Sequence, residues 1–371
     1  MGIENARALV EEVIDKAGGC AVIDGGLATQ LENHGASIND PLWSALCLLE
    51  HPNLIKRVHL EYLEAGADIL VTSSYQATLL GFLSRGLSTE EAESVLKKSV
   101  ALAIEARDQF WDAVSKSESG YNKALVAASI GSYGAYLADG SEYSGMYGKD
   151  VDVTKLKAFH RRRLQILAGA GPDLLAFETI PNKLETQWNV WATQYVDMAT
   201  VKDFSRHRLE ILAGAGPDLL GFETTPNKLE TQAIVELLEE ENIHIPSWIC
   251  FSCVDGQHAA SGESFKECLD IINESDKVAM AGINCAPPHF VESLICKFKK
   301  FTNKTIVVYP NKGEIWDGRA KKWLPSQCSN DEAFKSLALK WRDSGAKLIG
   351  GCCRTTPTTI RGISTVLKTR F

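Results

Sequence analysis

Three cysteines in the last third of the chain have the residue type and spacing of a metal site. Cys285 closes the segment Gly282–Cys285, and the adjacent Cys352 and Cys353 close Gly350–Cys353. Each segment follows a short apolar run that is typical of a strand. Three thiolates leave one zinc coordination position open for a substrate, as in catalytic zinc sites. The alternative is a set of buried free cysteines, which pack as small hydrophobic side chains.

The adjacency of Cys352 and Cys353 sets a geometric requirement. Neighbouring side chains of a regular strand point to opposite faces, so the two can share one metal only where the chain bends. The two glycines that precede them permit such a bend. A further pair, Cys250 and Cys253, has an odd spacing on a predicted strand, which puts the two on opposite faces. We therefore predict that this second pair serves packing rather than metal binding.

The composition is that of a globular protein that can bury a large core. The chain has 371 residues, of which 45% are hydrophobic and 23% charged, and its net charge is −8. No apolar run approaches the ~18 residues of a membrane span, and the negative charge argues against a nucleic-acid surface. Ten cysteines without a signal-peptide core suggest a reducing compartment, so we expect a cytoplasmic protein with free thiols. The basic run His160–Arg163 is expected to be the solvated face of a helix.

Strand and helix patterns alternate along the chain. Amphipathic helices are predicted at Thr89–Phe110, after a capping pattern that begins at Ser88, and at Asn330–Ser344. This alternation favours a parallel sheet with right-handed crossovers. Apolar runs typical of strands buried on both faces are predicted at Cys20–Gly26, Ile69–Tyr75, Leu125–Gly131, Asp173–Ile180, Asp218–Thr225, Pro246–Cys253, Val278–Cys285, Thr305–Asn311 and Ala346–Cys353.

One helix–strand unit occurs twice. Leu167–Gln187 recurs 45 residues later as Leu212–Gln232, with two differences. The similarity continues more weakly upstream, so the duplicated unit covers about residues 152–187 and 197–232. Without the duplication the chain has eight strands, which predicts an α/β fold of the (β/α)8 TIM-barrel type, as a single domain over residues 1–371.

The duplication gives nine predicted strands, one more than an eight-stranded barrel can contain. Strand number, tilt and shear are linked in a closed barrel, so one copy should lie outside the ring. Asp218–Thr225 is favoured as the barrel strand, because the helix predicted at Leu229–Glu241 leads directly to the next strand. The first copy, Asp173–Ile180, has the more native-looking upstream connection, which leaves the choice open. Trp188–Asp197 has no obvious place and is expected to be an irregular connection.

Polar residues at strand ends are further candidates, because barrel enzymes place their chemistry there. Asp24 follows the first predicted strand and could bind an ammonium group or cap a turn. The adjoining Gly25 and Gly26 let the backbone approach a ligand. The duplicated Phe-Glu-Thr supplies Glu178 or Glu223, either as a substrate-binding acid or as a structural ion-pair partner.

Five motifs follow one another along the chain: Asp24–Gly26, Ser132–Tyr143, a Phe-Glu-Thr-Ile-Pro-Asn segment, Gly282–Cys285 and Gly350–Cys353. Together they resemble the homocysteine S-methyltransferases, and most closely the plant S-methylmethionine-dependent type. The resemblance runs from about Cys20 to the C-terminus and is interrupted only by the duplicated block. It implies a barrel in which Cys285, Cys352 and Cys353 hold Zn2+. It also implies that Asp24 and the glutamate of Phe-Glu-Thr help to hold the amino-acid substrate.

The reaction implied by the resemblance is methyl transfer from S-methylmethionine, or S-adenosylmethionine, to the thiol of homocysteine, which yields methionine. Three thiolates on one divalent zinc leave a net negative centre, so a bound homocysteine sulfur would lose its proton and stay nucleophilic. A sulfonium donor should favour aromatic faces and carboxylates. Tyr75, Tyr133 and Tyr136 are candidates by position, although packing explains the last two equally well. We expect a monomer or small homo-oligomer, without nucleic-acid or membrane partners.

Other interpretations stay open at this point. Selenolate is also a soft zinc ligand, so methylation of selenocysteine is a neighbouring activity. Betaine is a less favoured donor, because the resemblance is closer to the enzymes that use sulfonium compounds. The non-enzyme alternatives are a zinc-binding but inactive barrel, disabled by the duplication, and a metal-free structural protein.

Overall fold

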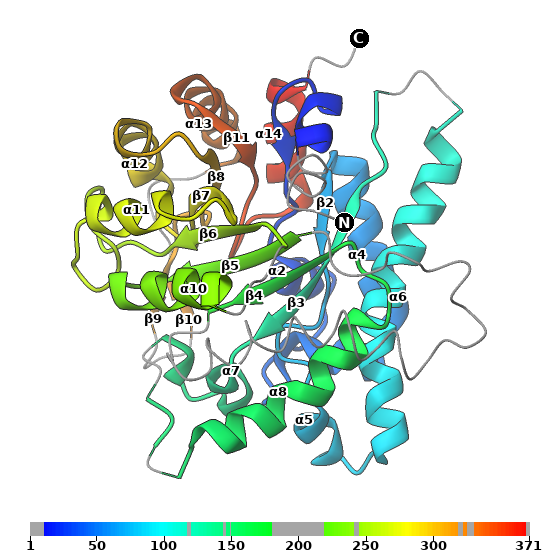
Figure 1. The fold of residues 1–371 in the computed structure, drawn as a ribbon. Helices are drawn as coiled ribbons and strands as arrows, with labels where there is room; N and C mark the ends of the chain where they lie inside the picture. The colour runs from blue at the N-terminus through cyan, green and yellow to red at the C-terminus, as the bar shows by residue number, and fades with distance from the viewer. Residues whose placement is uncertain are drawn as a thin grey trace, which may run out of the picture.

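Nine parallel strands form a ring in the computed structural model of the chain, and helices pack around its outside (Figure 1). The structure describes residues 11–116, 120–143, 146–148, 150–179, 219–240, 245–317, 322–324 and 330–368. Neighbouring strands follow the order β1-β11-β8-β7-β6-β5-β4-β3-β2. Their bounds are β1 Ala21–Val22, β2 Ile69–Val71, β3 Leu125–Gly131, β4 Leu174–Glu178, β5 Leu219–Thr225, β6 Ser247–Phe251, β7 Val278–Asn284, β8 Thr305–Tyr309 and β11 Ala346–Ile349.

The ring closes between β1 and β2 through a short contact. A parallel bridge joins Ile23 to Ile69. Beside it, the Asp68 N–H donates to the Val22 carbonyl at 2.7 Å and the Asp24 N–H donates to the Ile69 carbonyl at 3.0 Å. Each predicted strand contains one of the nine observed strands. The predicted barrel class is therefore confirmed.

The expectation that one copy of the duplicated strand lies outside the ring is wrong. β4 and β5 are adjacent and pair in parallel register, from Leu174 opposite Leu219 to Glu178 opposite Glu223. β4 also pairs with β3, and β5 with β6. Both copies have the same apolar pattern, so each fits the same position in the ring. Exclusion of either strand would leave its backbone groups unpaired and its leucines exposed to water.

Helices follow most strands and cover the ring from outside (Figure 1). The two predicted helix starts are confirmed, because Ser88 forms a capping box with Glu91 and the Asn330 side chain accepts from the Ala333 N–H. The irregular connection Trp188–Asp197 lies outside the described residues. The helices are α2 Leu27–Asn33, α3 Cys47–Glu50, α4 Pro52–Ala65, α5 Leu79–Leu83, α6 Thr89–Val114, α7 Tyr133–Leu137, α8 Val153–Ala168, α10 Lys228–Glu240, α11 Phe265–Asn273, α12 Pro288–Phe301, α13 Asp331–Ser344 and α14 Pro357–Leu367, and a hairpin pairs β9 Ile315–Asp317 with β10 Lys322–Leu324.

Two apolar cores lie on the two faces of the strands. The inner core fills the ring with side chains from all nine strands, and Val13 and Ile14 pack against it. The outer core lies between the strands and the helices. Cys250 belongs to the inner core and Cys253 packs against the outer one. The prediction that this pair serves packing is confirmed.

The basic run on α8 is not a uniformly solvated face, which corrects the expectation for His160–Arg163. Arg161 and Arg162 are exposed, but the His160 and Arg163 side chains are fully buried. Arg163 donates from Nη1 to the Gly131 carbonyl at 2.7 Å and from Nη2 to the carbonyls of Ser74 and Tyr75 at 2.8 and 2.7 Å. The guanidinium thus ties α8 to the end of β3 and to the loop that follows β2.

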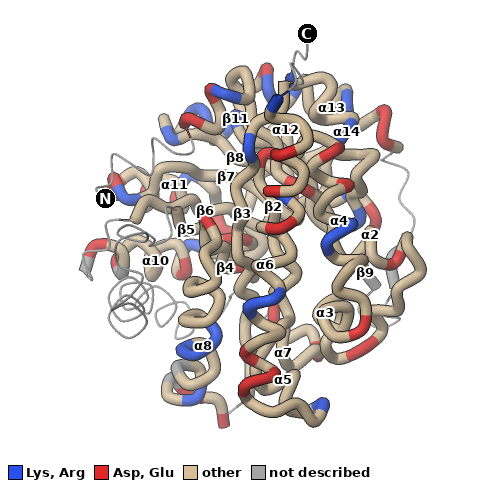
Figure 2. The backbone as a smooth tube through the Cα atoms, turned by 90° about the vertical axis from the view of Figure 1, so that its right-hand side faces the viewer, with Lys and Arg blue, Asp and Glu red and all other residues tan. Residues whose placement is uncertain are grey.

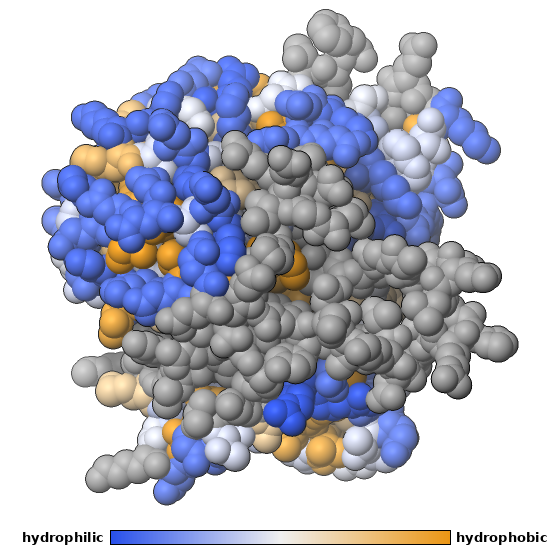
Figure 3. All heavy atoms as spheres, viewed as in Figure 1, coloured by the Kyte–Doolittle hydropathy of each residue, from blue (hydrophilic) through white to orange (hydrophobic). Residues whose placement is uncertain are grey.

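The outer surface carries charges of both signs. Figure 2 shows acidic and basic residues spread over the peripheral helices, including α4, α8 and α13. On the face in Figure 3, the described hydrophobic side chains form small patches among hydrophilic ones. Among the helices of the described ranges, none combines the length and the apolar character that a membrane crossing requires.

Candidate metal centre

Cys285, Cys352 and Cys353 converge at the ends of β7 and β11. Their three Sγ atoms all lie within 4.8 Å of one another, and the Sγ atoms of Cys352 and Cys353 are 4.0 Å apart. Thiolates that bind one tetrahedral zinc at about 2.3 Å are roughly 3.8 Å apart. The observed spacing therefore fits a metal ion with small inward movements of the side chains. Within the described part of the chain, these are the only residues found with such an arrangement.

The segment after β8 holds both cysteine-bearing turns in place. The Cys285 N–H donates to the Tyr309 carbonyl at 3.2 Å, and the Cys352 N–H donates to the Pro310 carbonyl at 2.9 Å. The Cys353 carbonyl accepts from the Lys312 N–H at 3.0 Å. Because β8 lies between β7 and β11 in the ring, its end is the natural bridge between the two turns.

The strand ends before the cysteine pair, as a metal site shared by two adjacent cysteines requires. β11 ends at Ile349, so the strand alternation does not apply to Cys352 and Cys353. The glycines of this motif serve close packing rather than an unusual φ. A Cβ on Gly351 would lie 2.3 Å from Oγ1 of Thr355, and a Cβ on Gly25 would lie 2.6 Å from the same atom. The Asp24–Gly26 motif therefore packs directly against the turn that carries the cysteines.

Cys285 has a left-handed backbone with a φ of 47°, which is uncommon for a residue other than glycine. The Asn311 side chain donates from Nδ2 to the Cys285 carbonyl at 3.1 Å and helps to hold this conformation. Sequence reasoning did not single out Asn311. Its place at the end of the predicted strand Thr305–Asn311 is the signal that could have identified it.

The three thiols shift one another's pKa values. The pKa of Cys353 is lowered well below its usual value, because the thiols of Cys285 and Cys352 hydrogen-bond to its sulfur. The pKa of Cys352 is raised by its interactions with Cys285 and Cys353 and by burial. A divalent cation bound here would displace the thiol protons, since metal ligands must be deprotonated.

Three carboxyl groups occupy the same end of the barrel. Burial raises the pKa of Glu178, and the nearby Cys353 raises it further. Burial and the nearby charge of Glu178 raise the pKa of Glu223. Burial also raises the pKa of Asp24, although the Val71 N–H, which donates to Asp24 Oδ2 at 2.9 Å, opposes this effect. One Asp24 oxygen therefore binds the backbone of the neighbouring strand β2 rather than a local turn.

Tyr133 lies in an aromatic cluster beside the barrel mouth. Its ring is 4% exposed and packs edge-on against Phe159, with centroids 4.9 Å apart. Tyr136 and Tyr147 each lie 5.6 Å from the Tyr133 ring, also measured between centroids. The substrate-binding role of Tyr133 stays a prediction, and packing accounts for the position of its ring in the structure.

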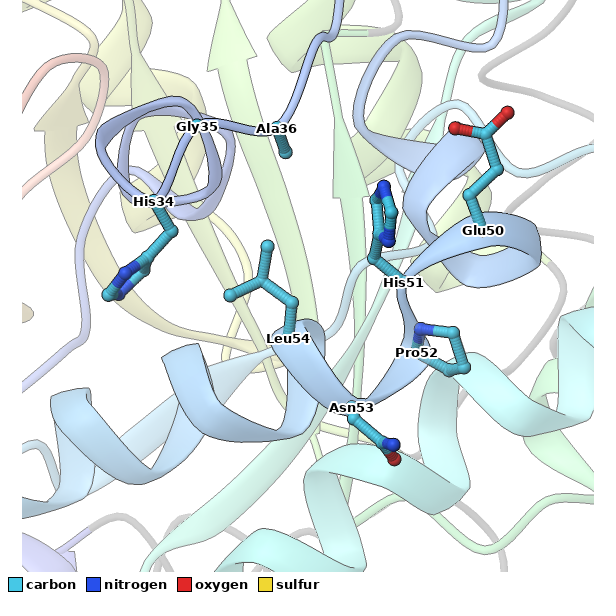
Figure 4. A pocket seen from close by; sticks show the side chains of 8 residues that line it. All are labelled: His34, Gly35, Ala36, Glu50, His51, Pro52, Asn53 and Leu54. Carbon is cyan, nitrogen blue, oxygen red and sulfur yellow. The ribbon is translucent and has the colours of Figure 1, made fainter.

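A shallow hollow of about 370 Å3 lies apart from the cysteines. It is lined by the segment after α2, the end of α3 and the start of α4, and Leu54 points towards it from α4 (Figure 4). His34, on its rim, contacts both Glu61 carboxylate oxygens at 2.9 Å. None of the cysteines or barrel carboxylates lines this hollow, so it does not belong to the metal centre.

Comparison with known proteins gives a consistent result. The family model described as "Homocysteine S-methyltransferase" matches residues 21–195 and 191–367. "Homocysteine S-methyltransferase 1" of Brassica oleracea var. italica is 62% identical, with the whole of both chains covered. "Selenocysteine Se-methyltransferase" of the same species is 47% identical over 97% of this chain and 92% of that relative.

A solved structure supports the fold. The metallated form of the homocysteine methyltransferase MmuM from Escherichia coli is 33% identical to this chain. The match covers 93% of this chain and 96% of the bacterial one, with a TM-score of 0.65.

Proposed function

We propose zinc-dependent methyl transfer to the thiol of homocysteine for this chain, which belongs to the homocysteine S-methyltransferase family. The observation that carries the proposal is the convergence of Cys285, Cys352 and Cys353. A soft thiolate set favours zinc among the common divalent ions. Zinc bound there would act as a Lewis acid that favours the thiolate form of the acceptor.

The chain's own residues account for binding and orientation. We expect a carboxylate of the duplicated motif, Glu178 or Glu223 at the ends of β4 and β5, to accept hydrogen bonds from the substrate ammonium group. The Asp24 side chain binds the Val71 N–H at the end of β2, and its carbonyl accepts from the Gly351 N–H of the cysteine turn at 3.1 Å. Gly25 and Gly26 let that backbone lie close to the turn. Orientation of this kind can contribute on the order of 7–11 kcal/mol to a reaction between two bound groups.

The methyl donor is proposed to be a sulfonium amino acid, S-methylmethionine or S-adenosylmethionine. The acidic barrel mouth supports a cationic donor, because Asp24, Glu178 and Glu223 interact electrostatically with one another there. Methionine would be the product. We also expect a cytoplasmic location and a monomer or small homo-oligomer.

The test combines metal analysis with an assay of methionine formation from S-methylmethionine and homocysteine. We expect about one zinc per chain and methyl transfer. Cys352→Ser should lose most of both, whereas Cys296→Ser, at an exposed cysteine, should keep both. Full zinc content and activity in Cys352→Ser would refute the assigned role of the cysteines.

Selenocysteine methylation is a second candidate. It is favoured by the 47% identity to the Brassica selenocysteine enzyme, and a selenolate suits the same soft site. Competition between homocysteine and selenocysteine for one limiting donor separates the two activities. The larger product yield at equal acceptor concentration identifies the preferred acceptor.

A further inference from the structure

The duplication brings two glutamates to one place in the barrel mouth. Glu178 and Glu223 are register partners on the adjacent strands β4 and β5, and neighbouring strands lie about 4.8 Å apart. Each glutamate is four residues after a leucine of the inner core, Leu174 or Leu219. Because strand side chains alternate, both carboxylates face the interior of the barrel.

The two carboxylates lie in an acidic setting. The charge of Asp24 also interacts with Glu178 and with Glu223. The buried Arg163 guanidinium is a cation that lowers the pKa of Glu178, and it also donates to the backbone carbonyls of Gly131, Ser74 and Tyr75. Two like charges in one site are stable only with a shared proton or a positive partner.

Three buried hydrogen-bonding atoms around the pair form no hydrogen bond of standard geometry within the described ranges, although Ser129 lies near Glu178 and lowers its pKa. They are Oε1 of Glu178, the hydroxyl of Tyr309 and the hydroxyl of Ser129. Tyr309 is 3% exposed and Ser129 is 1% exposed. The Tyr309 hydroxyl lies near Glu223 and opposes the rise of its pKa, yet the two do not form a hydrogen bond of standard geometry. Buried polar groups are nearly always hydrogen-bonded, so these atoms are available to a polar ligand or to water.

We propose that Glu178 and Glu223 act together as one binding site for the primary ammonium group of the amino-acid substrate. This inference rests on the proposed function and adds to it, because a ring with one copy of the strand would supply only one of the two carboxylates. A primary ammonium carries one positive charge and three donors. These match two carboxylates and one hydroxyl, for which Tyr309 and Ser129 are available. Both glutamates share the binding, and neither alone is essential.

The test uses the full zinc-loaded chain with Glu178→Gln, Glu223→Gln and the double variant. Calorimetry measures the Kd of L-homocysteine and of 4-mercaptobutanoate, which has the same thiol and carboxylate but no amino group. Hydrogen bonds to charged groups correspond to roughly tenfold to hundredfold in affinity. We expect each single variant to weaken homocysteine binding roughly tenfold and the double variant at least a hundredfold. Binding of 4-mercaptobutanoate should change less than threefold, roughly the scale of a weak polar contact.

Folding and charge effects have their own controls. Glu236→Gln removes a carboxylate from the exposed face of α10 and should leave both Kd values unchanged. Without substrate, the double variant should melt at a temperature no lower than that of the unaltered chain, because it removes a repulsive pair. A lower melting temperature would contradict the repulsion on which the inference depends.

The outcomes separate the two proposals. If one single variant weakens homocysteine binding as much as the double variant and the other has no effect, the shared site is wrong. If 4-mercaptobutanoate is weakened equally, the carboxylates do not recognise the ammonium group and the inference is also wrong. In both cases zinc content and methyl transfer in the unaltered chain leave the proposed function standing. Absence of zinc and of methyl transfer in the unaltered chain would overturn both.

Discussion

Asn284 and Thr224 form a paired hydrogen bond across the barrel mouth. The Thr224 N–H donates to Asn284 Oδ1 at 2.8 Å, and Asn284 Nδ2 donates to Thr224 Oγ1 at 2.8 Å. Asn284 immediately precedes Cys285, and Thr224 immediately follows Glu223. The second copy of the duplicated strand is therefore coupled directly to the turn that carries a metal-binding cysteine. Thr179 has the equivalent place in the first copy, with a similar left-handed φ of 56° against 63°.

Asn284→Ala should weaken zinc binding roughly tenfold to a hundredfold, the range typical for residues that orient metal ligands. The physical reason is that the Asn284 side chain is 1% exposed and fixes the end of β7 just before Cys285. Competition with a chromogenic chelator measures the zinc affinity. Thr179→Ala is the matched control, because the Asn284 hydrogen bonds go to Thr224. Equal loss of affinity in the control would contradict this role.

Removal of residues 179–223 should raise the melting temperature. The deletion takes out 45 residues (223 − 178 = 45) and joins Glu178 to Thr224, so one strand of the duplicated pair disappears. Eight strands close with the tilt and shear of an ordinary barrel, whereas the nine-stranded ring closes between β1 and β2 only through the Ile23–Ile69 bridge and two neighbouring backbone hydrogen bonds of the described residues. Differential scanning calorimetry of both chains, each loaded with zinc, tests this expectation.

The same deletion addresses the alternative of a barrel disabled by its extra unit. A large gain in methyl transfer together with a gain in melting temperature would support that alternative. A gain in melting temperature without a gain in activity would mean that the full chain is already competent. A lower melting temperature would mean that the ninth strand is an integral part of the fold.

The sequence pattern predicted the strands and the cysteine cluster, but it did not predict how the duplicated strands and Arg163 pack against the rest of the chain. Apolar runs predict strands because both faces of a parallel barrel are buried. The cysteines were predictable because strand ends meet at one edge of the ring. The inclusion of both Leu174–Glu178 and Leu219–Thr225 was not predictable, since their patterns are nearly identical and barrel closure is a property of the whole ring. The burial of Arg163 depends on carbonyl groups from β3 and from the loop after β2, which the local pattern of α8 does not contain.

Arg163→Lys should lower the free energy of unfolding by about 3 kcal/mol. A lysine has one ammonium group in place of the two guanidinium nitrogens that bind the carbonyls of Gly131, Ser74 and Tyr75. A buried carbonyl that loses its donor costs about 1–3 kcal/mol. Urea unfolding followed by tryptophan fluorescence measures the change.

Arg162→Lys provides the matched control on the same helix. The Arg162 side chain is 51% exposed and pairs with Glu93, and an exposed ion pair contributes at most about 1 kcal/mol. We expect the control to change the free energy of unfolding by less than that. Similar losses in both variants would mean that the buried guanidinium has no special structural role.

His59 should make the unfolding free energy fall as the pH is lowered from 7 to 5. The side chain is fully buried on α4, its ring nitrogens have no partner within the described residues, and burial lowers its pKa from 6.5 to about 4. Between these two values the unfolded chain binds a proton that the folded chain does not, so acid favours unfolding. The resulting loss of unfolding free energy between pH 7 and pH 5 is about 2 kcal/mol.

The His59→Leu variant tests this expectation, because it lacks the titrating ring. Its free energy of unfolding in urea should depend on pH more weakly by about this amount. Identical pH dependence in both proteins would mean that the imidazole is protonated in the folded state at pH 5.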